Sequence, residues 1–189
     1  MKFLGGSAAW EFLFYKHMRT SELKIAPPIP FYKTYIDVLG DVDLLEMLER
    51  QLKNFPKFIE NIPDGKLSYA YGPEKWTIAQ VLLHIIDSER VFQYRSLRFS
   101  RGDSTALPGF EQDLYAPNSR AETRSKESLI EEYIAVRQST ITLYRSFDAK
   151  TLSKQGVASN LPWNVATLGF VICGHQKYHR NILRERYLS

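Results

Sequence analysis

Residues 164–188, NVATLGFVICGHQKYHRNILRERYL, carry the pattern that decides the fold. Asn164 is a typical helix N-cap, because its side chain can accept a hydrogen bond from an early backbone N–H group. A stripe then recurs at steps of three and four residues: Val165, Leu168, Ile172, His175, His179, Ile182 and Arg186. Such a period is typical of one face of an α-helix that packs against a core. The stretch therefore predicts a helix that carries two histidines on its buried face.

Three other stretches repeat apolar residues with the same helical period: residues 41–59, 77–101 and 126–147. The first starts near Asp41 and should kink or end at Pro56, because proline disrupts a helix interior. Thr77 and Ser125 are suitable N-caps for the other two helices, and Gly102 is typical of a helix end. No stretch has a convincing strand pattern. Helices of this number without a sheet predict an all-α fold, a four-helix bundle.

The composition indicates a single folded domain. A chain of 189 residues, 44% hydrophobic and 24% charged, excludes global disorder. The only cysteine, Cys173, excludes an internal disulfide and a cysteine-rich zinc site, and it favours a reducing, cytoplasmic compartment. No apolar run of about 18 residues occurs, so we expect no membrane-spanning helix. The net charge is +4, but basic residues alternate with acidic ones, so we do not expect a nucleic acid partner.

The first 30 residues are predicted to be an N-terminal extension, partly outside the fold, with the bundle domain at residues 31–189. The start, MKFLGGSAAW, conforms poorly to a signal peptide, because Glu11 interrupts the apolar run. Met18 looks like a natural start, so His17 is left out of the chemistry. Residues 26–30, APPIP, should be extended, because proline restricts itself and the residue before it.

A long connection, residues 102–124, separates the second predicted helix from the third. Structureless loops longer than about 12–15 residues are uncommon in compact domains and are often functional. A crossover between distant helix ends explains the length equally well, and the two interpretations are compatible. Glu111 and Asp113 lie in this connection. They are candidates for a catalytic acid or base on a loop that would act as a lid.

The histidines are the candidate metal ligands. His175 and His179 are four residues apart, so their side chains lie one above the other on a helix. His84 lies in the apolar stretch AQVLLHII of the helix predicted over residues 77–101. Burying these polar rings without partners would be costly, and one shared metal ion would satisfy all three. The alternative is a set of hydrogen-bonded core histidines.

Neutral imidazoles suit zinc, nickel, iron or copper, whereas calcium and magnesium prefer oxygen ligands. Three protein ligands would leave coordination positions open, as catalytic sites do. Gln80 and Asp87 lie about one turn from His84 and could orient its ring. Glu89 and Arg90 are expected to make ordinary contacts on the helix surface.

These residues together resemble the DinB/YfiT-like superfamily of metal-dependent bundle proteins. The resemblance lies in KWTIAQ and HIID (75–80 and 84–87), RGD and LPGF (101–103 and 107–110), and GHQKYH and RERYL (174–179 and 184–188), and it spans residues 31–188. It implies an up-down-down-up bundle, often dimeric, with metal ligands at His84, His175 and His179. Many relatives have a second histidine where this chain has Tyr178, which leaves the ligands intact. Thiol-dependent transferases that use low-molecular-weight thiols belong to this family.

The first hypothesis is a cytoplasmic metalloenzyme, a hydrolase or thiol-dependent transferase acting on a small molecule. Its cofactor would be a divalent transition metal, zinc or nickel first and iron next. The alternative is a non-catalytic, stress-related bundle that binds a metal or a small ligand. A DNA-binding protein is a distant third, resting on the charge and the family name, and a homodimer is expected from the resemblance alone.

Overall fold

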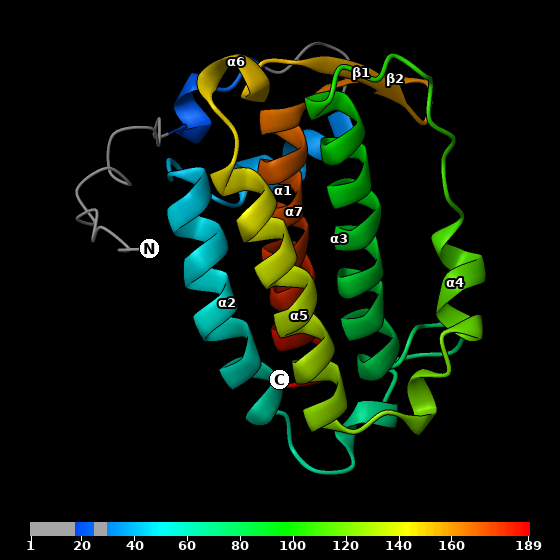
Figure 1. Cartoon of the computed structure of the whole chain (residues 1–189). Coiled ribbons are helices and arrows are strands. Elements are labelled where there is room, and N and C mark those ends of the chain that lie inside the picture. The colour runs from blue at the N-terminus through cyan, green and yellow to red at the C-terminus, as the bar shows by residue number, and fades with distance from the viewer. Residues whose placement is uncertain (1–17, 25–29) are drawn as a thin grey trace, which may run out of the picture.

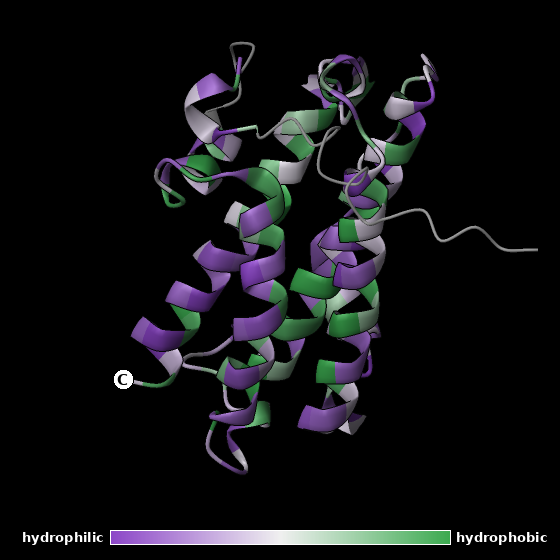
Figure 2. Ribbon diagram, turned by 60° about the vertical axis from the view of Figure 1, so that its left-hand side comes forward, coloured by the Kyte–Doolittle hydropathy of each residue, from purple (hydrophilic) through white to green (hydrophobic). Residues whose placement is uncertain are grey.

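The computed structural model describes residues 18–24 and 30–189, and four long helices form its body (Figure 1). They are α2 (Leu44–Glu60), α3 (Ile78–Ser100), α5 (Lys126–Arg145) and α7 (Val165–Ile182). Each has both hydrophobic and hydrophilic residues along it in Figure 2, as amphipathic helices require. The predicted all-α, four-helix-bundle fold is confirmed. Among the described helices, none combines the length and hydropathy needed to cross a bilayer.

The direction of the helices explains the long connection. In Figure 1, α2 and α7 run one way while α3 and α5 run the other, which is the predicted up-down-down-up order. Because α3 and α5 are parallel, the chain must travel back along the bundle between them. This crossover is not structureless, because it contains α4 (Gln112–Asn118) and the 3-10 turn Ala121–Thr123. Buried Ala116 anchors α4 in the protein.

The helix starts follow from local capping chemistry. Asp43, Thr77, Ser125 and Asn164 each accept a hydrogen bond from the backbone N–H three residues later. The expected start near Asp41 is therefore wrong by two residues, and the Asp41 carboxylate instead pairs with Arg19. Pro56 lies inside α2, which continues to Glu60.

Several short elements escaped the sequence interpretation. A helix, α1 (Pro30–Asp37), begins at the last residue of the Pro-rich segment 26–30, so the extended conformation expected there is wrong at Pro30. The rest of that segment lies outside the described residues. Another helix, α6 (Ala149–Leu152), precedes an antiparallel hairpin of β1 (Gln155–Ala158) and β2 (Leu161–Asn164). The expectation of no strand was thus wrong. Strands of four residues are too short for periodicity to show, and the turn depends on positive φ at Ser159 and Asn160.

Residues before the bundle also contact it. Leu44 N donates to the Met18 carbonyl at 3.0 Å, and Arg19 forms a β-bridge with Asp43. Part of the predicted extension therefore lies against α2. Residues 1–17, with His17 and the MKFLGGSAAW segment, lie outside the described part of the chain. The start at Met18 and the domain boundary at residue 31 stay predictions.

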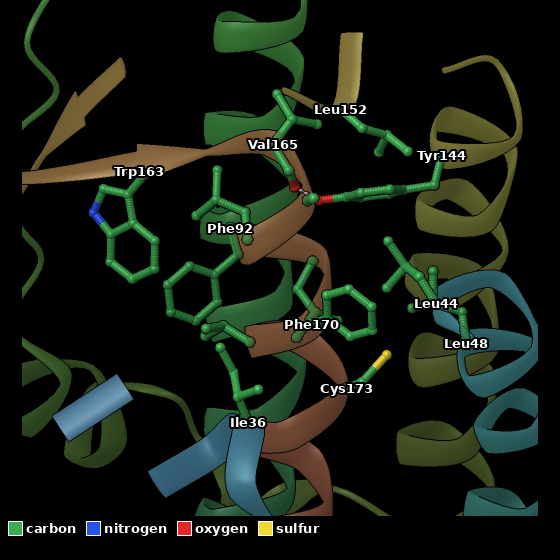
Figure 3. Close-up of a cluster of buried hydrophobic side chains, with 14 of the residues drawn as sticks. Ile36, Leu44, Leu48, Phe92, Tyr144, Leu152, Trp163, Val165, Phe170 and Cys173 are labelled. Atoms are coloured by element: carbon green, nitrogen blue, oxygen red, sulfur yellow. Dashed lines mark hydrogen bonds between the residues drawn. The ribbon is translucent and has the colours of Figure 1, made fainter. Parts of the chain in front are cut away.

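Helix α1 lies across α7 near its middle, and a glycine permits the close approach. A Cβ at Gly174 would come within 1.8 Å of the Tyr35 carbonyl oxygen, so only glycine fits there. Figure 3 shows the neighbouring core, where Phe92 of α3 and Phe170 of α7 fill the interior. In the same view Tyr144 reaches from α5 to the start of α7, where its hydroxyl donates to the Val165 carbonyl at 2.9 Å.

A buried polar network joins the four long helices. Arg137 of α5 is fully buried and donates to both carboxylate oxygens of Glu89 on α3, at 2.8 Å each. The same guanidinium donates to Gln51 of α2 and Gln176 of α7, at 2.8 and 2.9 Å. Tyr133 also donates to Gln176. The surface position expected for Glu89 is therefore wrong. Its side chain is 2% exposed and pairs with Arg137, which belongs to a helix distant in sequence.

Candidate metal centre

Three histidines from two helices meet in the bundle, because α3 supplies His84 and α7 supplies His175 and His179. One candidate ligand atom from each ring lies within 4.8 Å of the other two. The closest pair is His84 Nε2 and His175 Nε2, which are 2.9 Å apart. The ring centres of His175 and His179 lie 4.4 Å apart, as expected for residues one helical turn apart. The geometry thus brings all three predicted ligands together.

Burial leaves this cluster short of hydrogen-bond partners. His84 is 8% exposed and His175 5% exposed. His179 is half-buried, yet its Nε2 is shielded from solvent and has no partner among the described residues. A buried polar atom without a partner costs about 1–3 kcal/mol, so native proteins rarely retain one without a reason. A bound cation would supply the missing partner.

The surroundings keep the three rings neutral. Burial lowers the pKa of His84 to about 4. Burial, with the nearby His84, lowers the pKa of His179 to about 3. The pKa of His175 falls well below its ordinary value through burial and the two neighbouring histidines. At neutral pH all three are therefore in the uncharged form that binds metals.

Aromatic rings enclose the cluster. The ring of Trp76 lies 4.9 Å from that of His84, and the ring of Tyr35, from α1, lies 5.2 Å from that of His175. Phe92 adds a further wall, 6.3 Å from His175 between ring centres. These side chains exclude water from one side of the histidines, which strengthens any electrostatic interaction formed there.

Comparison with known proteins agrees with this geometry. A family model described as DinB superfamily matches residues 47–183. The chain belongs to the DinB superfamily. No curated protein matches this chain. Among solved structures, YfiT from Bacillus subtilis is similar in fold, with a TM-score of 0.63 and 15% sequence identity over 86% of this chain and 90% of that one. YfiT is described as a probable metal-dependent hydrolase with an unusual four-helix bundle topology.

The other candidates in this DinB-superfamily chain have different partners. Gln80 forms a capping box with Thr77 and donates to the Ala116 carbonyl at 3.4 Å. Asp87 accepts a hydrogen bond from Arg90 at 3.2 Å. The polar group beside His84 is Ser88, whose Oγ lies 3.5 Å from Nδ1. Ser88 lies one turn after His84, so the helical period could have identified it.

The two acidic candidates of the crossover lie at the surface. Glu111 precedes α4 and Asp113 lies in its first turn, and both side chains are exposed. Within residues 18–24 and 30–189, no recorded contact joins either carboxylate to a histidine. Their catalytic role, and that of α4 as a lid, stay predictions.

Arg95 was missed by the sequence interpretation. It is 2% exposed, and its Nη2 donates to the Pro108 carbonyl and to Ser159 Oγ. Its Nη1 has no partner in the part of the chain that the structure describes. The guanidinium lies 5.7 Å from the centre of the Phe92 ring, which also neighbours His175. The period of α3 places Arg95 three turns beyond His84 on a similar face, but periodicity alone cannot predict a buried arginine.

Proposed function

We propose that this chain is a metal-dependent hydrolase of small molecules and that His84, His175 and His179 hold its metal ion. One observation carries the proposal: three neutral imidazoles converge, two of them buried and the third half-buried, and Nε2 of His179 has no partner among the described residues. Hydrogen-bonded core histidines would have satisfied that atom from the protein itself. The description of YfiT as a metal-dependent hydrolase agrees with the proposal.

The donor set suits a divalent transition ion, zinc or nickel first and iron next, because all three donors are imidazole nitrogens. Such an ion, when bound, would act as a Lewis acid on a substrate carbonyl or phosphoryl group. Ser88 accepts from or donates to His84 Nδ1, depending on the tautomer, and so helps to set the ring orientation. Tyr35, Trp76 and Phe92 exclude water and favour an apolar substrate body.

Arg95 offers a place for a negatively charged group of the substrate. The Phe92 ring lies close to both Arg95 and His175, with its centre 5.7 Å from the Arg95 guanidinium carbon and 6.3 Å from the centre of the His175 ring. A small molecule bound along that ring could present its reacting group to the histidines and a carboxylate to Arg95. Charge-assisted hydrogen bonds of this kind are stronger than neutral ones.

Metal content and turnover together test the proposal. Untagged protein that has never contacted nickel resin is analysed by mass spectrometry, beside His179→Ala and the neighbouring control Tyr178→Phe. We expect about one transition-metal ion per chain in the wild type and the control. His179→Ala should lose it, together with hydrolysis of carboxylate-bearing esters and amides.

Two outcomes would redirect the proposal. A metal-free wild type whose stability falls in His179→Ala would make the histidines structural. A metal-loaded protein that hydrolyses none of the substrates would leave a metal-binding bundle without catalysis. Assays of the same substrates with added low-molecular-weight thiols, followed by product analysis, distinguish hydrolysis from transfer to the thiol.

A further inference from the structure

A cavity of about 140 Å³ opens between α2 and α7, away from the histidine cluster. Its floor consists of buried side chains: Met47, Gln51, Phe55 and Gln176. Its rim consists of more accessible polar side chains: Arg50, Asn54, Lys177 and Arg180. Gln176 and Arg180 each follow a metal-site histidine by one residue, so they point about 100° around the helix from those rings.

The rim carries positive charge that pairs with no carboxylate of the described residues. Within the described ranges, Arg50, Lys177 and Arg180 form no recorded ion pair, and Arg50 donates only to the sulfur of Met47. The nearby Glu49 pairs with Arg145 instead. The three cations therefore repel one another in the absence of an anion.

Two donors at the cavity also lack acceptors. The Gln176 side chain is 1% exposed, and its Oε1 accepts from Tyr133 at 3.0 Å and Arg137 at 2.9 Å. These two donors fix which end of the amide faces the network. Gln176 Nε2 donates to no acceptor among the described residues, although it is not fully shielded from solvent. Arg180 Nε is buried and has no partner among the described residues. The free amide donor of Gln176 on the floor, the unpaired Nε of Arg180 on the rim and the cations that have no carboxylate partner among the described residues all favour an anionic ligand.

We propose that this cavity binds a small oxyanion, a phosphate group, through Gln176, Arg180, Lys177 and Arg50. A phosphate group offers several strong acceptor oxygens and negative charge, which match two orphaned donors and three cations. The cavity, with a volume of about 140 Å³, admits one such group. The site lies on another face of α7 and does not depend on the metal chemistry proposed above.

Calorimetric titration of inorganic phosphate into EDTA-dialysed protein, at constant ionic strength, tests this site. The variants are Arg180→Gln and Lys177→Gln, with Lys53→Gln as the matched control. Lys53 is an exposed lysine of α2 outside the cavity lining, so it removes the same charge from the surface. We expect both cavity variants to bind phosphate at least tenfold more weakly than the wild type and the control.

Further titrations test whether phosphate binding is independent of the metal site and which phosphate compound binds best. His84→Ala should bind phosphate like the wild type, so a failed metal site would not remove the anion site. Circular dichroism checks that Arg180→Gln is folded, as expected for a rim position. A phosphomonoester such as glycerol phosphate binding more tightly than inorganic phosphate would identify a phosphorylated small molecule as the source, and equal affinity would identify the free ion.

The proposal would be overturned by a wild type that binds no phosphate at low ionic strength. It would also be overturned if Lys53→Gln weakened binding as much as Lys177→Gln, because diffuse surface charge would then explain the affinity.

Discussion

Two buried polar clusters lie in the same bundle and differ in how they are satisfied. The Arg137 network closes on itself: Glu89, Gln51 and Gln176 occupy the guanidinium from three other helices. The histidine cluster has one contact shorter than 3 Å between its rings, and it leaves His179 Nε2 with no partner among the residues described. The Arg137–Glu89 pair at the centre of the first cluster needs nothing from outside the protein, whereas the second cluster leaves a ring nitrogen without a partner among the described residues.

The difference indicates what each cluster does. A closed network of charges and amides specifies which helices meet and in which register, because any other arrangement would strand a buried charge. A cluster of neutral rings with an unpaired nitrogen does little to fix the helix register, but it can bind a cation. The bundle thus separates the polar residues that define its structure from those that we propose bind metal.

The largest expected effect comes from breaking the closed network. Arg137→Met should lower the free energy of unfolding by about 3–5 kcal/mol, because it leaves the Glu89 carboxylate buried without its partner. Urea denaturation measures this. Arg90→Met, which removes an exposed arginine of the same ion-pair chemistry, is the control and should cost less than about 1 kcal/mol. Equal losses in both variants would show that the network is not special.

Metal binding should stabilise the folded protein through the histidine cluster. Zinc at about 100 times its dissociation constant should stabilise the protein by about 2.7 kcal/mol, because only the folded state assembles the site. Thermal unfolding with zinc, and then with EDTA, measures the shift. Tyr178→Phe should keep the shift and His179→Ala should lose it. A zinc-dependent shift of equal size in His179→Ala would exclude this residue as a ligand.

Acid should destabilise the histidine cluster selectively. The lowered pKa values of His84, about 4, and His179, about 3, mean that the unfolded chain binds protons first as the pH falls. Stability is therefore full above pH ~6.5 and declines towards pH ~4, by about 1.4 kcal/mol per pH unit for each histidine that charges only on unfolding. Denaturation of metal-free protein between these values measures the slope. An unchanged slope in His84→Ala would contradict the assignment.

The smallest effect is expected for His179→Ala in metal-free protein. The variant loses packing but also removes an unsatisfied buried nitrogen, so the two contributions oppose each other. We expect a change within about 1 kcal/mol in chemical denaturation. A much larger loss would mean that His179 is structural.

Much of the bundle could be predicted because its signals are local. The stripe of α7 and the caps at Thr77, Ser125 and Asn164 depend on residues within a few positions of one another. The same local signals predict that His84, His175 and His179 face the core, and the structure buries the first two and half-buries His179. Confirming their role requires the metal measurement above.

The remaining features depend on distant parts of the chain. Glu89 has the sequence pattern of a surface residue, and only the packing of α5 against α3 supplies its partner Arg137. The partners of Arg95, Pro108 and Ser159, are also distant in sequence, so the sequence cannot show that its Nη1 is left unpaired among the described residues. Gly174 is needed because α1 crosses α7 at that point.

The sequence alone determined the number of long helices, three of their four N-caps and the faces that carry the histidines, because helical period and capping act over short distances. The tertiary structure decided which buried polar groups find partners. Whether a buried polar group finds a hydrogen-bond partner depends on contacts between residues far apart in the chain. Arg137 has its partners, whereas His179, Arg95 and Arg180 each have one atom unpaired in the described structure.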